Sequence, residues 1–263
     1  MKDTGYCYAM PHRASENREL TSNLEAFGLP ERLRCSLGLR RVAEGAASLE
    51  DAAQRFCGYY YDHLVDGDGN RACALVRCYV THPFGSLPIE LQKFARAAAA
   101  APVARDTRCL TLAGTAGIEP DWNSCRGSRD HQAIPLVSAE MVENAPMIAQ
   151  LIRAFGLNVS DVAGSGSSIV NDLGGKTYGV FYVPDARGSS YIPAQEDFIE
   201  RYAVKSVVGS GAALASGELF AIVLFSRVAI SADAAERFRA LALDAKAALL
   251  RYSTDEVFDQ PAS

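Results

Sequence analysis

The strongest constraint on the fold of this chain is an uninterrupted apolar run, Leu219-Phe-Ala-Ile-Val-Leu-Phe225. Because the run has no polar member, we expect a strand whose two faces are both covered by other parts of the protein. Ser216-Gly217 stands just before it and predicts a hairpin turn. The segment 203–214 is therefore expected to pair with the segment 218–228 as two antiparallel strands.

A long helix is predicted directly after this hairpin. Ser231 is a suitable N-terminal cap. A stripe of apolar residues follows it at helical spacing, namely Phe238, Leu241, Ala242, Ala245 and Leu249. Before the hairpin, the segment 177–183 predicts another strand, and the segment 195–201 predicts a short helix.

The first half of the chain alternates helices with strands. Ser48 and Asp51 fit a capping-box pattern at the start of a helix over 49–64, and a Gly-rich turn over 66–70 ends it. The other predicted segments are a helix over 24–46 with a break near Leu29-Pro30, strands over 72–80 and 109–113, a helix over 88–101, a polar loop over 115–132, a helix over 138–155 interrupted at Pro146, and a flexible segment over 163–168. Together these elements predict an α+β domain, a mostly antiparallel sheet flanked by helices.

Composition narrows the class of protein. The chain has 263 residues, 49% of them hydrophobic, which is enough for a large core. The net charge of −5 comes without a basic stripe, so we expect no nucleic-acid partner. The apolar runs are too short to span a bilayer, and the first residues lack the apolar core of a signal peptide. We therefore expect a cytoplasmic protein with no membrane partner.

Several stretches resemble a known family. The segment 198–250 is similar to the C-terminal half of a GAF domain, with Val204–Val208, the sequence Ser216-Gly217-Glu218-Leu219 and the closing helix as the matching parts. The stretches ACALVR, THPFG, CLTLAGTAG, EPDWNS, HQAIPL, FYVPDA and YIPAQEDF resemble GAF-like input regions of bacterial sensor histidine kinases. The resemblance implies a GAF-like sheet with large insertions between its first three strands.

This resemblance also implies a domain organisation and a function. Residues 1–47 are expected to form a partly helical N-terminal extension, 48–252 the GAF-like sensory domain, and 253–263 a C-terminal tail. The implied function is a cytoplasmic sensory domain of bacterial signal transduction that binds a small molecule or cofactor. The flanking segments 24–64 and 232–252 would pair in a homodimer and pass the signal to an output protein or domain. The sequence leaves open whether the chain is a complete sensor or a fragment of one.

Candidate ligand contacts gather around the single tryptophan. Trp122 stands in the polar stretch EPDWNSCRGSRDHQAIPL, and the resemblance favours Trp122, Asn123, Ser124 and His131 over Arg126 and Arg129. His82 follows the first strand and is expected to approach the same pocket as His131. The alternative for both histidines is a structural hydrogen bond that holds a loop.

Two tyrosines complete the predicted site. Tyr182 and Tyr191 lie on and just after a strand that we expect to face the cavity, because tyrosine combines an apolar ring with one polar group. A core position is the alternative for each. No residue pattern identifies a cofactor, and haem, bilin and metal all stay open as candidates.

Cysteine chemistry offers a second function. The seven cysteines form no CxxC pair, and no zinc-ligand spacing is visible, so buried thiols are the expected state. Some GAF-fold proteins are methionine sulfoxide reductases, and a pairing of Cys109 with Cys125 would suit that chemistry. A third hypothesis is a ligand-free dimerisation module whose pocket is filled by its own side chains.

Overall fold

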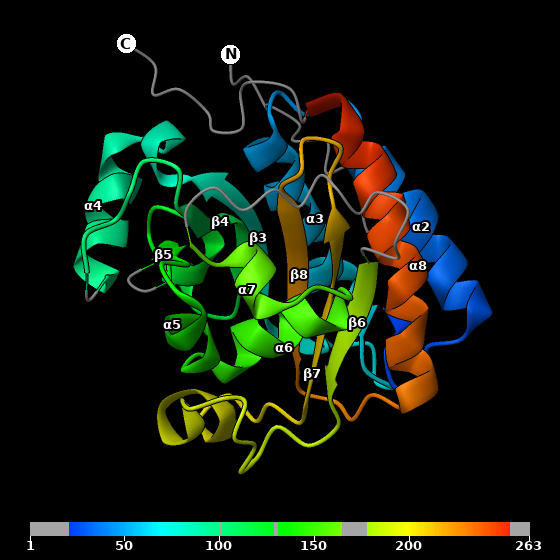
Figure 1. Cartoon of the computed structure of the whole chain (residues 1–263). Coiled ribbons are helices and arrows are strands. Elements are labelled where there is room, and N and C mark those ends of the chain that lie inside the picture. The colour runs from blue at the N-terminus through cyan, green and yellow to red at the C-terminus, as the bar shows by residue number, and fades with distance from the viewer. Residues whose placement is uncertain (1–20, 100, 129–130, 165–177, 253–263) are drawn as a thin grey trace, which may run out of the picture.

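The computed structural model describes residues 21–99, 101–128, 131–164 and 178–252. The predictions made for residues 1–20, 129, 165–177 and 253–263 lie outside the described residues. The secondary structure elements are named as in Figure 1, in chain order.

A six-stranded sheet forms the centre of the domain. Its strands are β3 (Cys73–Pro83), β4 (Arg108–Gly117), β5 (Ala133–Pro135), β6 (Tyr178–Val183), β7 (Ser206–Ala213) and β8 (Leu219–Ser226). They lie in the order β5-β4-β3-β8-β7-β6, and every neighbouring pair is antiparallel. The two predicted terminal strands pair as a hairpin, closed by Gly217 at a φ of 83°. This left-handed backbone suits glycine.

One face of the sheet carries three long helices (Figure 1). They are α2 (Leu29–Ala43), α3 (Leu49–His63) and α8 (Ala232–Leu249), followed by a short 3-10 turn, η5 (Leu250–Tyr252). A two-stranded parallel pair, β1 (Ser22–Asn23) and β2 (Leu64–Val65), joins the chain before α2 to the end of α3. Segments on both sides of residue 47 therefore belong to one packed layer.

The opposite face is covered by shorter elements from the insertions. They are η2 (Pro120–Asn123), α5 (Ala139–Glu143), α6 (Pro146–Ala154), α7 (Val159–Val162) and a short π-type helix, η4 (Gln195–Glu200). Two further elements, η1 (Phe84–Ser86) and α4 (Ile89–Ala98), lie between β3 and β4 and pack against β5. The insertions between the first three long strands are thus as expected. This architecture confirms the α+β class, with a central antiparallel sheet flanked by helices.

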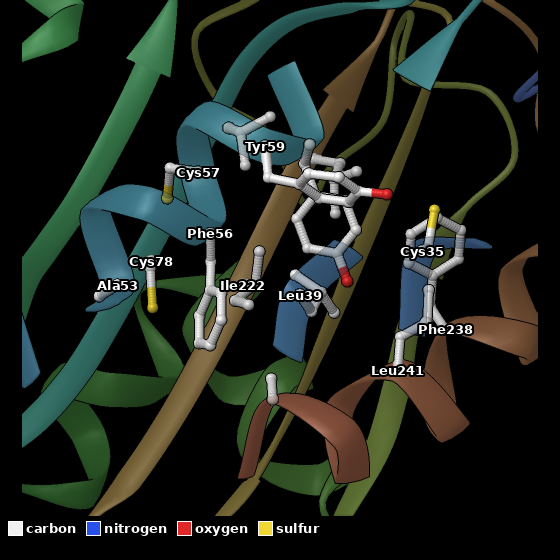
Figure 2. Close-up of a cluster of buried hydrophobic side chains, with 14 of the residues drawn as sticks. Cys35, Leu39, Ala53, Phe56, Cys57, Tyr59, Cys78, Ile222, Phe238 and Leu241 are labelled. Atoms are coloured by element: carbon white, nitrogen blue, oxygen red, sulfur yellow. The ribbon is translucent and has the colours of Figure 1, made fainter. Parts of the chain in front are cut away.

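Strand β8 contributes side chains to both hydrophobic cores of the domain. Phe220, Ile222 and Leu224 belong to the core beneath α2, α3 and α8. The alternate residues from Leu219 to Phe225 belong to the core on the other face. Figure 2 shows part of the first core, where side chains of α2, α3 and α8 lie with Cys78 of β3 and Ile222 of β8. The prediction that this apolar strand is covered on both faces is confirmed.

Local signals place the helix ends where the sequence predicted them. The Ser48 hydroxyl accepts a hydrogen bond from the Asp51 amide at 3.0 Å, and Ser231 does the same for Ala234 at 3.2 Å. The predicted break near Pro30 is the true start of α2, since proline suits the first turn of a helix. The second long strand extends to Gly117, so the polar loop begins later than predicted, because its alanines and glycines fit between α3 and β3.

Helices α2 and α8 lie side by side and run in the same direction. Phe27, just before α2, stacks on Phe238 near the start of α8, with ring centroids 5.0 Å apart. Farther along, Arg40 forms an ion pair of 2.7 Å with the buried Asp244. At the far ends the Tyr252 hydroxyl donates to the carbonyl of Ala43 at 2.8 Å. Three contacts of different kinds therefore join the two helices along their length.

Glycines allow α6 to lie directly on the sheet. Gly179 of β6 and Gly211 of β7 are cross-strand partners. A Cβ atom added at Gly179 would lie 1.7 Å from the Ala154 carbonyl oxygen, and one at Gly211 would lie 2.6 Å from the Phe155 ring. Side chains at these two positions would hold α6 away from the sheet.

Among the described residues, no helix combines the length and the apolar character needed to cross a bilayer.

We predict that Gly179→Ala destabilises the domain by about 1–3 kcal/mol, because the new methyl group meets backbone that cannot move cheaply. The matched control is Gly58→Ala, in the interior of α3, where an added Cβ meets nothing within 4 Å. The control is expected to stabilise by roughly 0.5–1 kcal/mol through helix propensity. Urea denaturation of the three proteins measures both changes, and equal effects at the two glycines would contradict the close approach of α6.

Candidate functional site

A small internal cavity lies between α6 and the sheet. Its volume is about 20 Å³, and its lining is apolar except for Thr81 of β3. The apolar lining comes from Leu110, Leu136, Ile148, Leu151, Ile152, Phe155, Val162, Leu219, Phe220 and Ala221. A cavity of this size holds about one water molecule. Side chains of α6 therefore occupy most of the space beneath that helix.

Thr81 is the only residue of this lining with a polar side chain, and its hydroxyl is bonded within the protein. It donates to the Glu218 carboxylate at 2.5 Å and accepts from the Leu219 amide at 2.9 Å. Burial raises the pKa of Glu218, while the hydrogen bond from Thr81 and the nearby Arg108 guanidinium act in the opposite direction. Because Glu218 is not part of the lining and the Thr81 hydroxyl already has two partners, the surface of the cavity is apolar.

His82 lies on the other side of β3 from this cavity. Consecutive residues of a strand point to opposite faces, so His82 and the cavity-lining Thr81 diverge. His82 pairs across the sheet with Cys109, and burial lowers its pKa from 6.5 to about 4. It is therefore neutral at physiological pH. The expected approach of His82 and His131 to a common pocket is not found, since His131 lies exposed in the loop before β5.

Trp122 packs into an aromatic cluster instead of lining an open pocket. Its ring lies 4.7 Å from that of Tyr202 and 5.7 Å from that of Phe198, between ring centroids. Phe198 in turn meets Phe225 of β8 edge to face at 5.0 Å. The Tyr202 hydroxyl donates to Glu119 at 2.7 Å. This cluster joins η2 to η4 across the face of the sheet. Trp122 is therefore partly buried against the core of this face.

The residues after Trp122 have structural contacts. The Asn123 side-chain amide accepts from the Gly117 N–H at 3.0 Å and donates to the carbonyls of Gly117 and Glu119 at 3.1 and 3.0 Å. It therefore imitates a strand partner at the end of β4. Ser124 is exposed, and its carbonyl accepts from the amides of the next turn. His131 has a φ of 63°, an uncommon backbone conformation for a non-glycine residue.

Tyr182 and Tyr191 lie on opposite sides of the sheet. Tyr182 packs against the core of α8, and its hydroxyl donates to the Ile230 carbonyl. Tyr191 packs on the α6 side, edge to face with Phe181 at 5.8 Å. The two rings thus contribute to different cores, because alternation along β6 directs Tyr182 to the helix layer.

An open groove runs along β6, the last strand of the sheet. Its volume is about 320 Å³. The groove is lined by Gln150, Arg153 and Ala154 of α6, by Val180, Phe181 and Tyr182 of β6, and by Tyr191. Two residues of the predicted site, Tyr182 and Tyr191, thus line this groove together, and neither lines the internal cavity.

The proposed reductase pair is separated by the sheet. Cys109 begins β4 and packs with Phe84, whereas Cys125 contacts Gln54 of α3, which is bonded to Thr115. Cys109 and Thr115 are six positions apart along β4, which corresponds to roughly 20 Å. Burial raises the pKa of both thiols to about 12, so both are protonated and poor nucleophiles. The hypothesis of this cysteine pair is therefore not supported by the geometry.

Sequence reasoning missed the residues of the internal cavity. Thr81 fell just beyond the predicted strand over 72–80, whereas Leu151 and Phe155 were ordinary positions of the predicted helix over 138–155. Their sequence signal is the set of glycines beneath α6, Gly179 of β6 with Gly209 and Gly211 of β7. Among the described residues, no group of three or more His, Cys, Asp or Glu side chains is placed to hold a metal ion.

Comparisons with known proteins give a likeness in fold. No protein-family model matches the chain, and a search of curated proteins finds no match. Among solved structures, the chain is similar to the phycoerythrobilin-bound GAF domain from a cyanobacterial phytochrome, with a TM-score of 0.43 and 11% identity. The match covers 84% of this chain and 95% of that one.

The pKa of His82 predicts a pH dependence of stability. The unfolded chain binds a proton near pH 6.5, whereas the folded state resists protonation down to about pH 4, so the stabilisation is complete above pH 6.5 and is lost as pH falls. We expect the His82 contribution to fall by about 2 kcal/mol between pH 7.5 and pH 5. His82→Gln removes this part of the pH dependence in urea denaturation, and His131→Asn retains it. An unchanged pH profile in His82→Gln would contradict the assignment.

Proposed function

We propose that this chain is a small-molecule sensory domain of bacterial signal transduction that works as a homodimer in the cytoplasm. One observation supports it above the others. The internal cavity and the helix layer lie on opposite faces of the same strand, β8, so a guest on one face bears directly on the packing of the other. A ligand changes the signal only if it favours one helix arrangement over another.

The guest suited to this site is a small apolar molecule. The apolar lining would contact it on all sides, since the Thr81 hydroxyl is already bonded to Glu218 and to the Leu219 amide. Because the cavity is about 20 Å³, binding requires α6 to move away from the glycines beneath it. This differs from the site expected around Trp122 and His131.

The dimer surface is proposed on α2. Leu29, Leu33 and Leu37, here called the leucine row, are 58%, 48% and 68% exposed, and their spacing of four residues puts them on one side of the helix. Leu243 of α8 is 41% exposed and is next to Asp244, the partner of Arg40 one turn beyond Leu37. Exposed leucines in such a row favour association with a second copy.

A second candidate function is a dimerisation module without a ligand. The size and apolar lining of the cavity favour it, since α6 already fills the space where a guest would bind. Both candidates use the same dimer surface. They differ in whether any small molecule stabilises the domain and alters the helix layer.

We predict that Leu33→Glu shifts the protein from dimer to monomer, because a charge replaces an apolar contact at the centre of the leucine row. Ile89→Glu is the matched control, since Ile89 on α4 is 69% exposed and lies away from α2. Sedimentation velocity at several concentrations measures the oligomeric state. A monomeric unaltered chain, or a Leu33→Glu variant that remains dimeric, would overturn the proposed interface.

Ligand binding is tested first by the absorption spectrum of freshly purified protein, which reveals a coloured cofactor, and then by a thermal-shift screen of small metabolites. A sensory domain is expected to gain roughly 2–4 °C in Tm for each kcal/mol of stabilisation by a binder. The same binder should alter hydrogen exchange in α2 and α8.

Two neighbouring variants make this test specific. Ile148→Phe fills the cavity, and Met147→Phe adds similar bulk beside it without lining it. A binder in the cavity loses its effect on Tm only in Ile148→Phe. Stabilisation without altered exchange in α2 and α8 would contradict signalling through these helices, and a screen with no binder would favour the ligand-free module.

A further inference from the structure

The two edges of the sheet differ in how they are covered. On the β5 side, α4 packs against the last strand. On the other side, β6 is the last strand, and its described backbone hydrogen bonds all go to β7. Among the described residues, the six residues of β6 make no backbone hydrogen bond to any other segment. In an antiparallel pair, every second residue directs its N–H and C=O groups away from its partner. Strand β6 thus presents a row of unpaired backbone groups.

The sequence of this edge lacks the usual protection. Proteins commonly block an exposed edge with a charged side chain, a proline or a bulge. Strand β6 reads Tyr-Gly-Val-Phe-Tyr-Val, with no charge and no proline, and pairs with β7 without a register shift. Its side chains are those preferred within sheets. Nothing in the sequence of β6 therefore prevents another strand from pairing with this edge.

We propose that the β6 groove binds an extended, uncharged peptide segment of a partner protein, which adds to the sheet as a further strand. The groove of about 320 Å³ follows the β6 edge, so a bound segment would lie along its unpaired N–H and C=O groups. Main-chain hydrogen bonds of this kind supply affinity, and the side-chain surroundings supply specificity.

The walls of the groove define the chemistry of the segment. On the α6 side, alternate side chains of the segment would meet Phe181 and Tyr191, which favours apolar or aromatic residues there. Gln150 offers a neutral hydrogen-bonding partner. Arg153 is already matched by Glu143 through contacts of 2.5 and 2.6 Å, so this wall carries no excess charge. An uncharged segment is the complement of these walls.

A single uncharged strand matches this groove, because one unpaired strand edge lies beside an apolar and neutral wall. Association of a second copy through the same edge is a different outcome, which the test below distinguishes. The groove also shares no residue with the leucine row or with the lining of the internal cavity. The proposal therefore stands or falls independently of the proposed sensory function.

The test uses the intact chain and three synthetic peptides in which threonine alternates with valine, isoleucine or tyrosine. Hydrogen exchange is followed at the β6 amides, and affinity is measured by isothermal titration. At least one peptide is expected to bind at about millimolar concentration or below and to slow exchange at alternate β6 amides. The same peptide with its alternate amides N-methylated keeps its side chains but loses donors, and it is expected to bind at least about tenfold more weakly.

A pair of variants locates the binding site. Gln150→Trp fills the groove and is expected to weaken peptide binding by about tenfold or more. Glu140→Trp on the exposed surface of α5 is the control and should leave binding unchanged. Absence of binding by all three peptides would overturn the proposal. Slow exchange of all β6 amides in the free protein would also overturn it, because the edge would then already be covered. Protection that depends on protein concentration would identify a second copy as the cover, and protection that does not would identify this chain itself.

Discussion

Burial of both faces of β8 is the constraint on which the rest of the structure depends. A strand of eight buried residues is stable only between two apolar layers, and the chain supplies one from α2, α3 and α8 and another from its insertions. The hairpin with β7 and the pairing with β3 then fix the order of the sheet. The two cores share one wall, and a change of packing on either face is felt on the other.

The two layers are built differently, and this difference suggests how the domain works. The helix layer is long, continuous and held by the Arg40–Asp244 ion pair and the Phe27–Phe238 stack. The opposite layer consists of short helices, of which α6 rests on glycines and leaves a small apolar void. A short helix over a void costs less to displace than a long helix in a packed bundle. Ligand-driven movement is therefore proposed for α6, and association for α2.

The edges of the sheet add a second asymmetry. The insertion that contains α4 covers the side of β5, while among the described residues the outer backbone groups of β6 have no partner beside a groove. Helices from insertions, α4 on one side and α6 on the other, thus give the two edges different surroundings. Function in such a domain resides in these additions more than in the sheet itself.

Periodicity and capping in the sequence were enough to determine most of the elements of this protein. The apolar run of β8, the Ser216-Gly217 turn and the Ser48 and Ser231 caps act over a few residues, so their structural outcome is local. The candidate site was different, because its geometry depends on which face each side chain takes after distant strands pair. Alternation on β6 directed Tyr182 and Tyr191 to different cores, and Trp122 packs, partly buried, against Tyr202 in an aromatic cluster. Only the tertiary structure could decide that α6 lies close enough to the sheet to fill the space beneath it, since that approach depends on glycines brought together from separate strands.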